Sequence, residues 1–229
     1  MRLITIVPSL LLMAALVDSS TTTRPPAKRS NTVTFDGHAE AIAHIPRSNG
    51  TMAATSLSSF FASNEADSVL IGGAQSTYNR YDDTWEAKQT PINFLGLELT
   101  PVFRNRLVKS PFQRKVTVSV LDSTTHASEG RIGTTLANLM KKSRIMAKTT
   151  IRWSQEDDGS YQIRGSLQMS IDADIPTYLP LPPGFDAIGS KVVSITAKKK
   201  LQENMDDLAK VFESWYTERG VEGSVTMPS

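Results

Sequence analysis

The apolar residues of the C-terminal third recur with the period of an α-helix. Their spacing alternates between four and three, which puts them on one narrow stripe of a helix: Leu201, Met205, Leu208, Phe212 and Trp215. The opposite face is charged, and Gly220 follows as a helix stop. The pattern predicts a long helix from Gly184 to Arg219 that packs on the core with this stripe.

The first half of this predicted helix follows a second stripe. Ile188, Val192 and Ile195 keep helical spacing, but the six-residue step from Ile195 to Leu201 rotates the stripe by about a third of a turn. We therefore expect a bend near Ala197 or a first half that is covered on two sides. Gly189 costs about 1 kcal/mol relative to alanine inside a helix, unless another element packs close to its backbone.

Alternation of apolar and polar residues predicts strands in the preceding chain. Asn31 to Ile45 alternates strictly, with the apolar or small residues from Val33 to Ile45 on one face. Further strands are predicted at Val69–Ile71, Thr84–Lys88, Leu95–Val108 with a break at Pro101, Arg114–Leu121, Ile145–Trp153 and Tyr161–Ile171. The sequence Glu156-Asp157-Asp158-Gly159 predicts the turn of a hairpin.

Two segments between the strands are predicted to differ from them. Leu57, Phe60 and Phe61 have helical spacing and predict a short helix with one apolar side within Met52 to Ser63. Asp122 to Arg144 has no clear period, so we expect a loop there with one helical turn at Leu136 to Met140.

This order of elements is that of the helix-grip fold, in which a curved antiparallel sheet wraps a long C-terminal helix and leaves a cavity between them. Three segments also resemble those of a known family: Phe94-Leu95-Gly96-Leu97-Glu98-Leu99-Thr100-Pro101, the Pro-rich passage from Ile175 to Pro183, and the ending Leu208, Phe212, Trp215, Tyr216. Together they make the chain from Val33 to Arg219 resemble a plant-plastid and cyanobacterial family of unknown function, near the START and polyketide-cyclase-like superfamily. The resemblance implies an α+β fold and a plastid setting, and the family has no agreed catalytic residues to carry over.

The beginning of the chain has the composition of a targeting segment. Arg2, the apolar run Leu3 to Val17 and a basic, hydroxyl-rich stretch to Ser30 predict a signal peptide joined to a transit-like leader. We thus expect a leader at 1–30, one domain at 31–220 and a flexible tail at 221–229, with delivery to a plastid. No aromatic residue follows the signal segment, which keeps secretion or an endomembrane lumen open, where the sequon Asn49-Gly50-Thr51 would matter.

Charge and motifs narrow the function. The chain has 25 Lys and Arg against 23 Asp and Glu, and without the basic leader it is almost neutral, so we expect no nucleic-acid partner. The absence of cysteine excludes disulfides and thiolate nucleophiles. His38 and His44 share a strand face with Glu40, but residues six apart on a strand lie roughly 20 Å apart, so we expect no metal site. No phosphate, dinucleotide or metalloprotease motif predicts a cofactor.

A sheet wrapped around a helix tends to leave an apolar pocket, which is the default binding site. We therefore expect a non-enzymatic binder of a lipid, isoprenoid or pigment, although each candidate side chain has a plain core position as its alternative. An inward amide such as Asn105 needs a partner, because a buried unpaired amide costs about 1 to 3 kcal/mol. The candidate cavity residues are Phe103, Asn105, Trp153, Ile163, Leu167, Met169, Ile188 and Val192.

Two other functions stay open. The first is a membrane-surface or complex-assembly factor in the plastid, which would use the basic stretch from Arg104 to Arg152. The second is a cyclase- or hydrolase-like enzyme, for which His126 is the one conventional acid or base outside the first strand, in an expected loop. The oligomeric state is left open by the sequence.

Overall fold

The computed structural model describes residues 30–46, 56–72, 75–89, 92–94, 97–127, 143–176, 181 and 183–222. Several predictions of the sequence lie outside these residues: the leader up to residue 29, the sequon, the helical turn at Leu136 to Met140 and the tail beyond residue 222.

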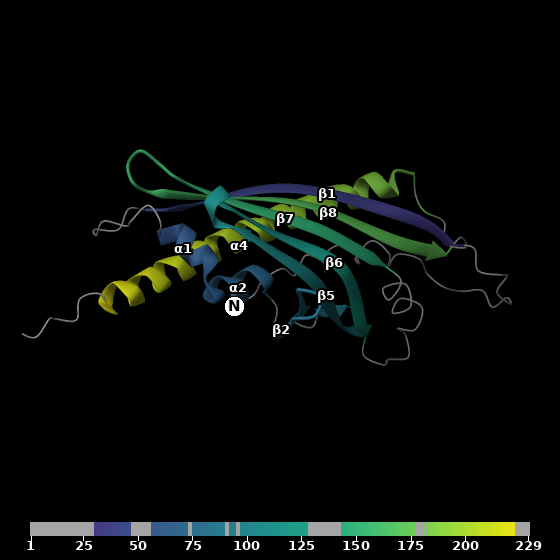
Figure 1. The fold of residues 1–229 in the computed structure, drawn as a ribbon. Coiled ribbons are helices and arrows are strands. Elements are labelled where there is room, and N and C mark those ends of the chain that lie inside the picture. Colours follow the sequence, from purple (N-terminus) through teal and green to yellow (C-terminus); the bar gives the residue numbers. More distant parts are fainter. Residues whose placement is uncertain are drawn as a thin grey trace, which may run out of the picture.

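Eight antiparallel strands form one sheet, in the order β1-β8-β7-β6-β5-β3-β2, with β4 paired to β5. The strands are β1 (Ser30–Ile45), β2 (Gln75–Asn79), β3 (Thr84–Lys88), β4 (Ile92–Phe94), β5 (Leu97–Ser110), β6 (Lys115–Ala127), β7 (Arg144–Gln155) and β8 (Tyr161–Pro176). The helical elements are α1 (Ser56–Ala62), α2 (Asn64–Ile71), the 3-10 turn η2 (Pro111–Gln113) and α4 (Phe185–Glu222). Figure 1 shows the curved sheet on one side of α4, with α1 and α2 beside that helix. The structure confirms the α+β, helix-grip-like fold predicted from the element order.

The predicted alternation of β1 and β8 is confirmed. Inward residues of both strands are buried: Phe35, Ala39, Ala41, Ala43 and Ile45 on β1, and Tyr161, Ile163, Leu167, Met169 and Ile171 on β8. The two strands pair along their whole length from Ser30–Pro176 to Ile45–Tyr161. A continuous ladder of this length holds both inward rows on the same concave face.

The N-terminal half of α4 lies close against β1. A Cβ atom added to Gly189 would lie 2.3 Å from Cδ1 of Phe35, and one added to Gly37 would lie 2.6 Å from Cγ1 of Val193. The expectation that another element packs close to the backbone of Gly189 is therefore confirmed. Because each element presents a glycine to the other, the helix can approach the strand more closely than larger residues would permit.

The stripe predicted for this half of α4 is wrong. Ile188 and Ile195 are 44% and 61% exposed, whereas Val193 and Ala197 are fully buried. The face of the helix that packs on β1 contains Gly189 and Val193. It is offset by one position from the predicted row that begins with Ile188 and Val192. Further along the helix the prediction is confirmed, since Leu201, Met205, Leu208 and Phe212 are all buried.

Three other predictions differ from the structure. Val69 to Ile71 end helix α2, and no strand forms there. The Gly72 N–H donates to the Ser68 carbonyl at 3.2 Å and closes the helix. A short apolar run has no period that separates a buried strand from a buried helix end. Strand β5 continues through Pro101, and β6 continues through Asp122 to Ala127, so His126 lies on a strand. Pro101 is tolerated because it lies where the β3 ladder ends, next to the last pair Lys88–Val102, and its carbonyl still accepts the Gln89 N–H at 2.8 Å.

Candidate functional site

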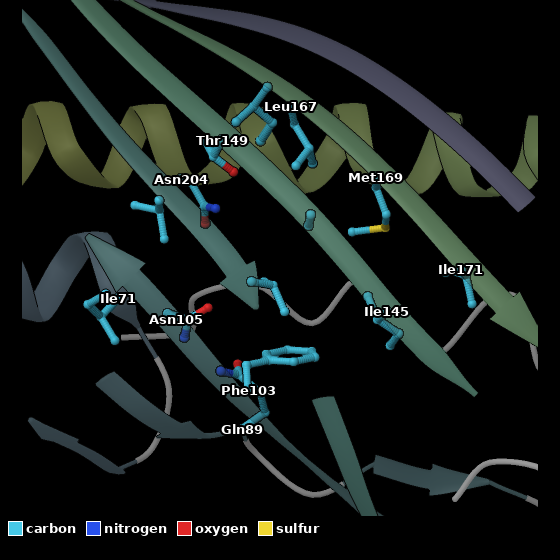
Figure 2. A pocket seen from close by; sticks show the side chains of 14 residues that line it. Ile71, Gln89, Phe103, Asn105, Ile145, Thr149, Leu167, Met169, Ile171 and Asn204 are labelled. Carbon is cyan, nitrogen blue, oxygen red and sulfur yellow. The ribbon is translucent and has the colours of Figure 1, made fainter. Parts of the chain in front are cut away.

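A largely enclosed hollow lies between the concave face of the sheet and the middle of α4. Its volume is about 40 Å³. Figure 2 shows side chains from the strands and from α4 pointing into it. The lining residues are Ile71 of α2, Gln89 after β3, Phe103 and Asn105 of β5, Val118 and Val120 of β6, Ile145, Ala147 and Thr149 of β7, Leu167, Met169 and Ile171 of β8, and Leu201 and Asn204 of α4.

A second, smaller hollow of about 20 Å³ lies next to the first. Val118, Thr149 and Asn204 line both hollows, and the second extends toward Val69 and Leu70 of α2. The three shared side chains therefore separate two spaces that would join if those side chains moved apart.

The lining combines apolar side chains with three buried carboxamides. Asn105 is 4% exposed, Gln89 2% and Asn204 8%. The Oδ1 atom of Asn204 is buried and has no hydrogen-bond partner in the described part of the chain. Figure 2 shows Asn204 on α4 and Asn105 on β5 both reaching into the space between helix and sheet. An unpaired carbonyl in such surroundings normally marks a place for water or for a ligand.

The structure brings four of the eight predicted cavity residues together at this pocket: Phe103, Asn105, Leu167 and Met169. Trp153 belongs to the core under α1, where its ring stacks on Phe61 at 4.3 Å and its Nε1–H donates to Ser58 Oγ at 3.1 Å. Ile163 is fully buried in the same core. Val192 is half-buried on the first half of α4, and Ile188 is exposed.

Sequence reasoning missed Asn204 and Gln89. Asn204 lies three residues after Leu201 and four before Leu208, so it shares the apolar face of α4. A carboxamide inside an apolar stripe was the available signal for a polar group aimed at the core. Gln89 had no such signal, because it follows the end of β3 outside any periodic segment.

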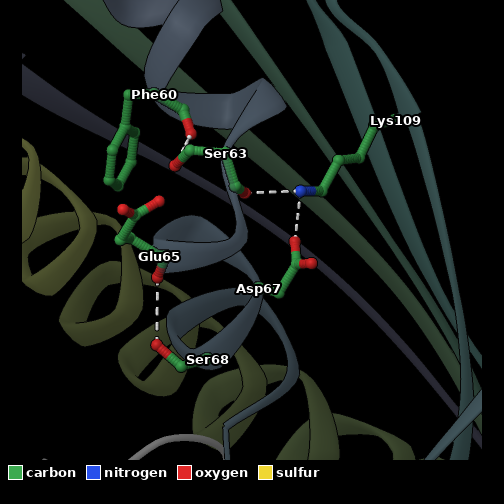
Figure 3. Close-up of polar contacts among 6 residues, drawn as sticks. All are labelled: Phe60, Ser63, Glu65, Asp67, Ser68 and Lys109. Atoms are coloured by element: carbon green, nitrogen blue, oxygen red, sulfur yellow. Dashed lines mark hydrogen bonds and ion pairs between the residues drawn. The ribbon is translucent and has the colours of Figure 1, made fainter. Parts of the chain in front are cut away.

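Helix α2, which contributes Ile71 to the pocket, is fastened to the sheet by a half-buried ion pair. Lys109 of β5 pairs with Asp67 of α2 and donates to the Ser63 carbonyl at 2.6 Å. Figure 3 shows this lysine reaching the junction of α1 and α2, where Ser63 and Ser68 also bond to backbone carbonyls. The pair fixes α2 beside the pocket.

Aromatic side chains hold α1 and β8 against the C-terminal half of α4. Phe60 contacts Phe212 at 5.6 Å and Trp215 at 5.5 Å between ring centroids, and Tyr161 lies 6.2 Å from Phe212. Burial raises the pKa of Tyr161 above its usual value of about 10, and the nearby Arg114 offsets only part of this increase. Tyr161 therefore belongs to the packing of the helix and stays neutral at ordinary pH.

The remaining polar candidates do not assemble a further centre in the described residues. His126 is exposed and lies opposite Thr100, on the part of β6 that pairs with β5. No group of three His, Asp or Glu side chains among the described residues is placed to hold a metal ion. None of the described helices combines the length and apolar character that crossing a bilayer requires.

Comparison with known proteins finds similar folds at low sequence identity. No family model matches the chain, and no curated protein matches it. Norcoclaurine synthase from Thalictrum flavum is 13% identical, with 84% of this chain and 98% of that chain covered and a TM-score of 0.41. The Zhui aromatase/cyclase from Streptomyces is 9% identical, with 78% and 94% covered and a TM-score of 0.39. An uncharacterised protein from Rhizobium leguminosarum is 10% identical, with 80% and 99% covered and a TM-score of 0.37.

All three likenesses have identities of 13% or less and TM-scores of 0.41 or less. At this degree of likeness they say nothing about what this chain binds, so its function has to be argued from its own pocket.

Proposed function

We propose that the protein is a non-enzymatic binder of a hydrophobic small molecule, which it takes up between the concave face of the sheet and α4. The observation that carries the proposal is the composition of the pocket. Ten of its fourteen lining residues are aliphatic, aromatic or methionine, and the other four are Gln89, Asn105, Thr149 and Asn204. Apolar walls with a few polar groups are typical of sites for small apolar ligands.

The pocket widens in this proposal when the ligand enters. A water molecule needs roughly 10 to 15 Å³ of such space, so the hollow under α4 has room for about three waters. A lipid, isoprenoid or pigment fits only if Val118, Thr149 and Asn204 move and join the two hollows. The composition of the leader supports a plastid as the place of binding, with secretion or an endomembrane lumen as the alternative.

A binder accounts for this lining better than an acid–base enzyme does. All fourteen lining residues have side chains that do not ionise, and general acid–base catalysis needs a group that exchanges a proton near the operating pH. His126, the acid or base singled out in the sequence, lies on the exposed surface and does not line the pocket. A cyclase- or hydrolase-like activity therefore ranks behind binding.

The test is native mass spectrometry of the full chain purified from its own cell, with solvent extraction of the same sample. We expect an added mass of one small apolar compound, which organic solvent removes. Ala147→Leu is the matched variant, because the added side chain occupies the hollow that Ala147 lines. A bare mass for the parent protein under gentle ionisation, or the same bound compound in the Ala147→Leu protein, would contradict the proposal.

A second function, contact with an anionic membrane surface, is favoured by one row of the outer face of the sheet. Lys115 pairs in register with Arg152, which pairs with Arg164, so three cations lie opposite one another on adjacent strands. Like charges in register destabilise a sheet, and each contributes about 1 kcal/mol of attraction near an anionic bilayer. Phe112, fully exposed in η2, lies just before this row in the chain.

Flotation with phosphatidylglycerol-containing vesicles tests this second function. We expect binding that is lost at high salt and lost in Arg152→Glu. Binding that survives both changes, or no binding at low salt, would refute surface attraction.

A further inference from the structure

On α4, the side-chain carbonyl oxygen of Asn204 has no hydrogen-bond donor in the described part of the folded chain. Asn204 is 8% exposed, and its Oδ1 is buried without a hydrogen bond in the described part of the chain. It lies on the apolar face of α4, where a leucine would extend the stripe of Leu201, Met205 and Leu208. A polar group at this position is unfavourable for the fold unless something other than the described chain bonds to it, because the chain itself offers no donor.

The strand register places two further polar groups near the same part of the pocket. Asn105 lies in the row that runs through Val120, Ala147 and Met169, and Thr149 lies in the adjacent row with Val118 and Leu167. Ile145 and Ile171 form the next row on the other side of Ala147. The pocket therefore has polar groups beside Asn204 and apolar side chains at Ile145 and Ile171, while Gln89 lies beside Phe103, as Figure 2 shows.

We propose that this pocket selects a neutral, mainly apolar molecule that carries a hydroxyl group, and that Asn204 binds the hydroxyl while the apolar part lies against Ile145, Met169 and Ile171. This inference rests on the proposed binding function. A hydroxyl donates one hydrogen and accepts others, so it can donate to Oδ1 of Asn204 and accept from a carboxamide N–H or from Thr149.

The lining explains why the ligand is neutral. None of the fourteen lining residues that the structure describes carries a charge, so a carboxylate or an ammonium group would find no counter-ion among them. A pure hydrocarbon is disfavoured for a different reason, because it would leave the Asn204 carbonyl unpaired. A hydroxyl is the smallest neutral group that removes both difficulties.

Phenol and toluene are suitable probes, since they have nearly the same shape and differ by a hydroxyl in place of a methyl group. Titration of the full chain with each probe, followed by NMR, gives a phenol-to-toluene affinity ratio. In the parent protein we expect phenol to bind at least as tightly as toluene. In Asn204→Leu we expect the ratio to fall by about tenfold, the effect of one hydrogen bond to a buried group.

Two further variants keep the result decisive. Gln202→Leu also removes a carboxamide from α4, but Gln202 bonds to the Ile42 carbonyl at 2.8 Å and does not line the pocket, so its ratio should match the parent. Asn105→Leu should lower the ratio by a smaller factor, and it decides the question if Asn204→Leu does not fold.

The outcomes separate the two proposals. If both probes bind and neither pocket variant changes the ratio, the hydroxyl site is refuted and the binding function stands. A strong preference of the parent for toluene, as expected of a dry apolar cavity that holds no polar anchor, has the same meaning. If neither probe binds to the folded parent protein, both proposals fail.

Discussion

Two parts of α4 meet the sheet in different ways. In the first half, Gly189 and Val193 lie against Phe35 and Gly37 of β1, with no space for an added methyl group. At its middle, Leu201 and Asn204 face a hollow of about 40 Å³ over β5 to β8. One continuous helix thus closes the core at one place and leaves it open at another.

The difference shows how a rigid helix can hold a cavity open. At one end, glycines on both elements let α4 approach β1, and at the other, Phe60 of α1 contacts Phe212 and Trp215. A helix fixed at two points cannot settle onto the strands between them. The pocket follows from this geometry, and the predictions below test its two supports and the polar group between them.

The largest effect is expected at the tight contact. Gly189→Val adds atoms where even a Cβ would lie 2.3 Å from the Phe35 ring, so the helix and the strand must separate. We expect the free energy of unfolding to fall by about 3 kcal/mol, as for strong overpacking. Urea denaturation measures it, and Ala187→Val on the exposed side of the same helix is the control, with a loss below about 1 kcal/mol. Equal stability of the two variants would mean that the close contact does not exist.

The second largest effect is expected at the ion pair that fastens α2 to the sheet. Lys109→Met leaves Asp67 half-buried without its cation, and we expect a loss of about 2 kcal/mol, less than for a fully buried pair. The matched control is Lys210→Met, because Lys210 is exposed and lies 3.6 Å from Asp207; its effect should stay within about 0.5 kcal/mol. Replacing Asp67 by leucine as well should restore part of the loss. A double variant no more stable than Lys109→Met would argue against the pairing.

Replacing the polar group in the hollow should raise the stability, in contrast to the two variants above. Asn204→Leu removes an unpaired buried carboxamide and extends an apolar stripe, so we expect the empty protein to gain about 1 kcal/mol. Thermal unfolding of ligand-free protein measures the gain. A loss of stability would show that the parent carboxamide already has a partner in the folded protein.

The smallest effect concerns the aromatic support. Because burial raises the pKa of Tyr161 in the folded state, the unfolded chain releases that proton first as the pH rises above about 10. Its contribution to stability is complete below that pH and is lost above it. We expect Tyr161→Phe to show a shallower decline in the free energy of unfolding between about pH 9 and pH 11 than the parent. Identical slopes would exclude a shifted Tyr161.

Much of the fold was predictable because it depends on local periodicity. The alternation of β1 and β8 and the stripe from Leu201 to Phe212 each state which face is buried, and the structure agrees. Such patterns need only the geometry of one element. The strand predicted at Val69 to Ile71 is wrong because a prediction from periodicity needs a longer run, and three apolar residues are too few to show a period.

The candidate site was predicted only in part. Phe103, Asn105, Leu167 and Met169 were chosen as inward residues of strands, and they do line the pocket. Trp153 is equally inward, yet α1 covers it, and no periodicity indicates which helix lies over which part of a sheet.

The sequence by itself determined the elements, their buried faces and the order that implies a sheet around a C-terminal helix. The tertiary structure decided where that helix touches the sheet and where it does not. That choice depends on pairs far apart in the chain, such as Gly189 with Phe35 and Phe60 with Phe212, which hold the helix in place. The unpaired Asn204 carbonyl also depends on the tertiary structure, because a group is unpaired only when every distant neighbour has been placed.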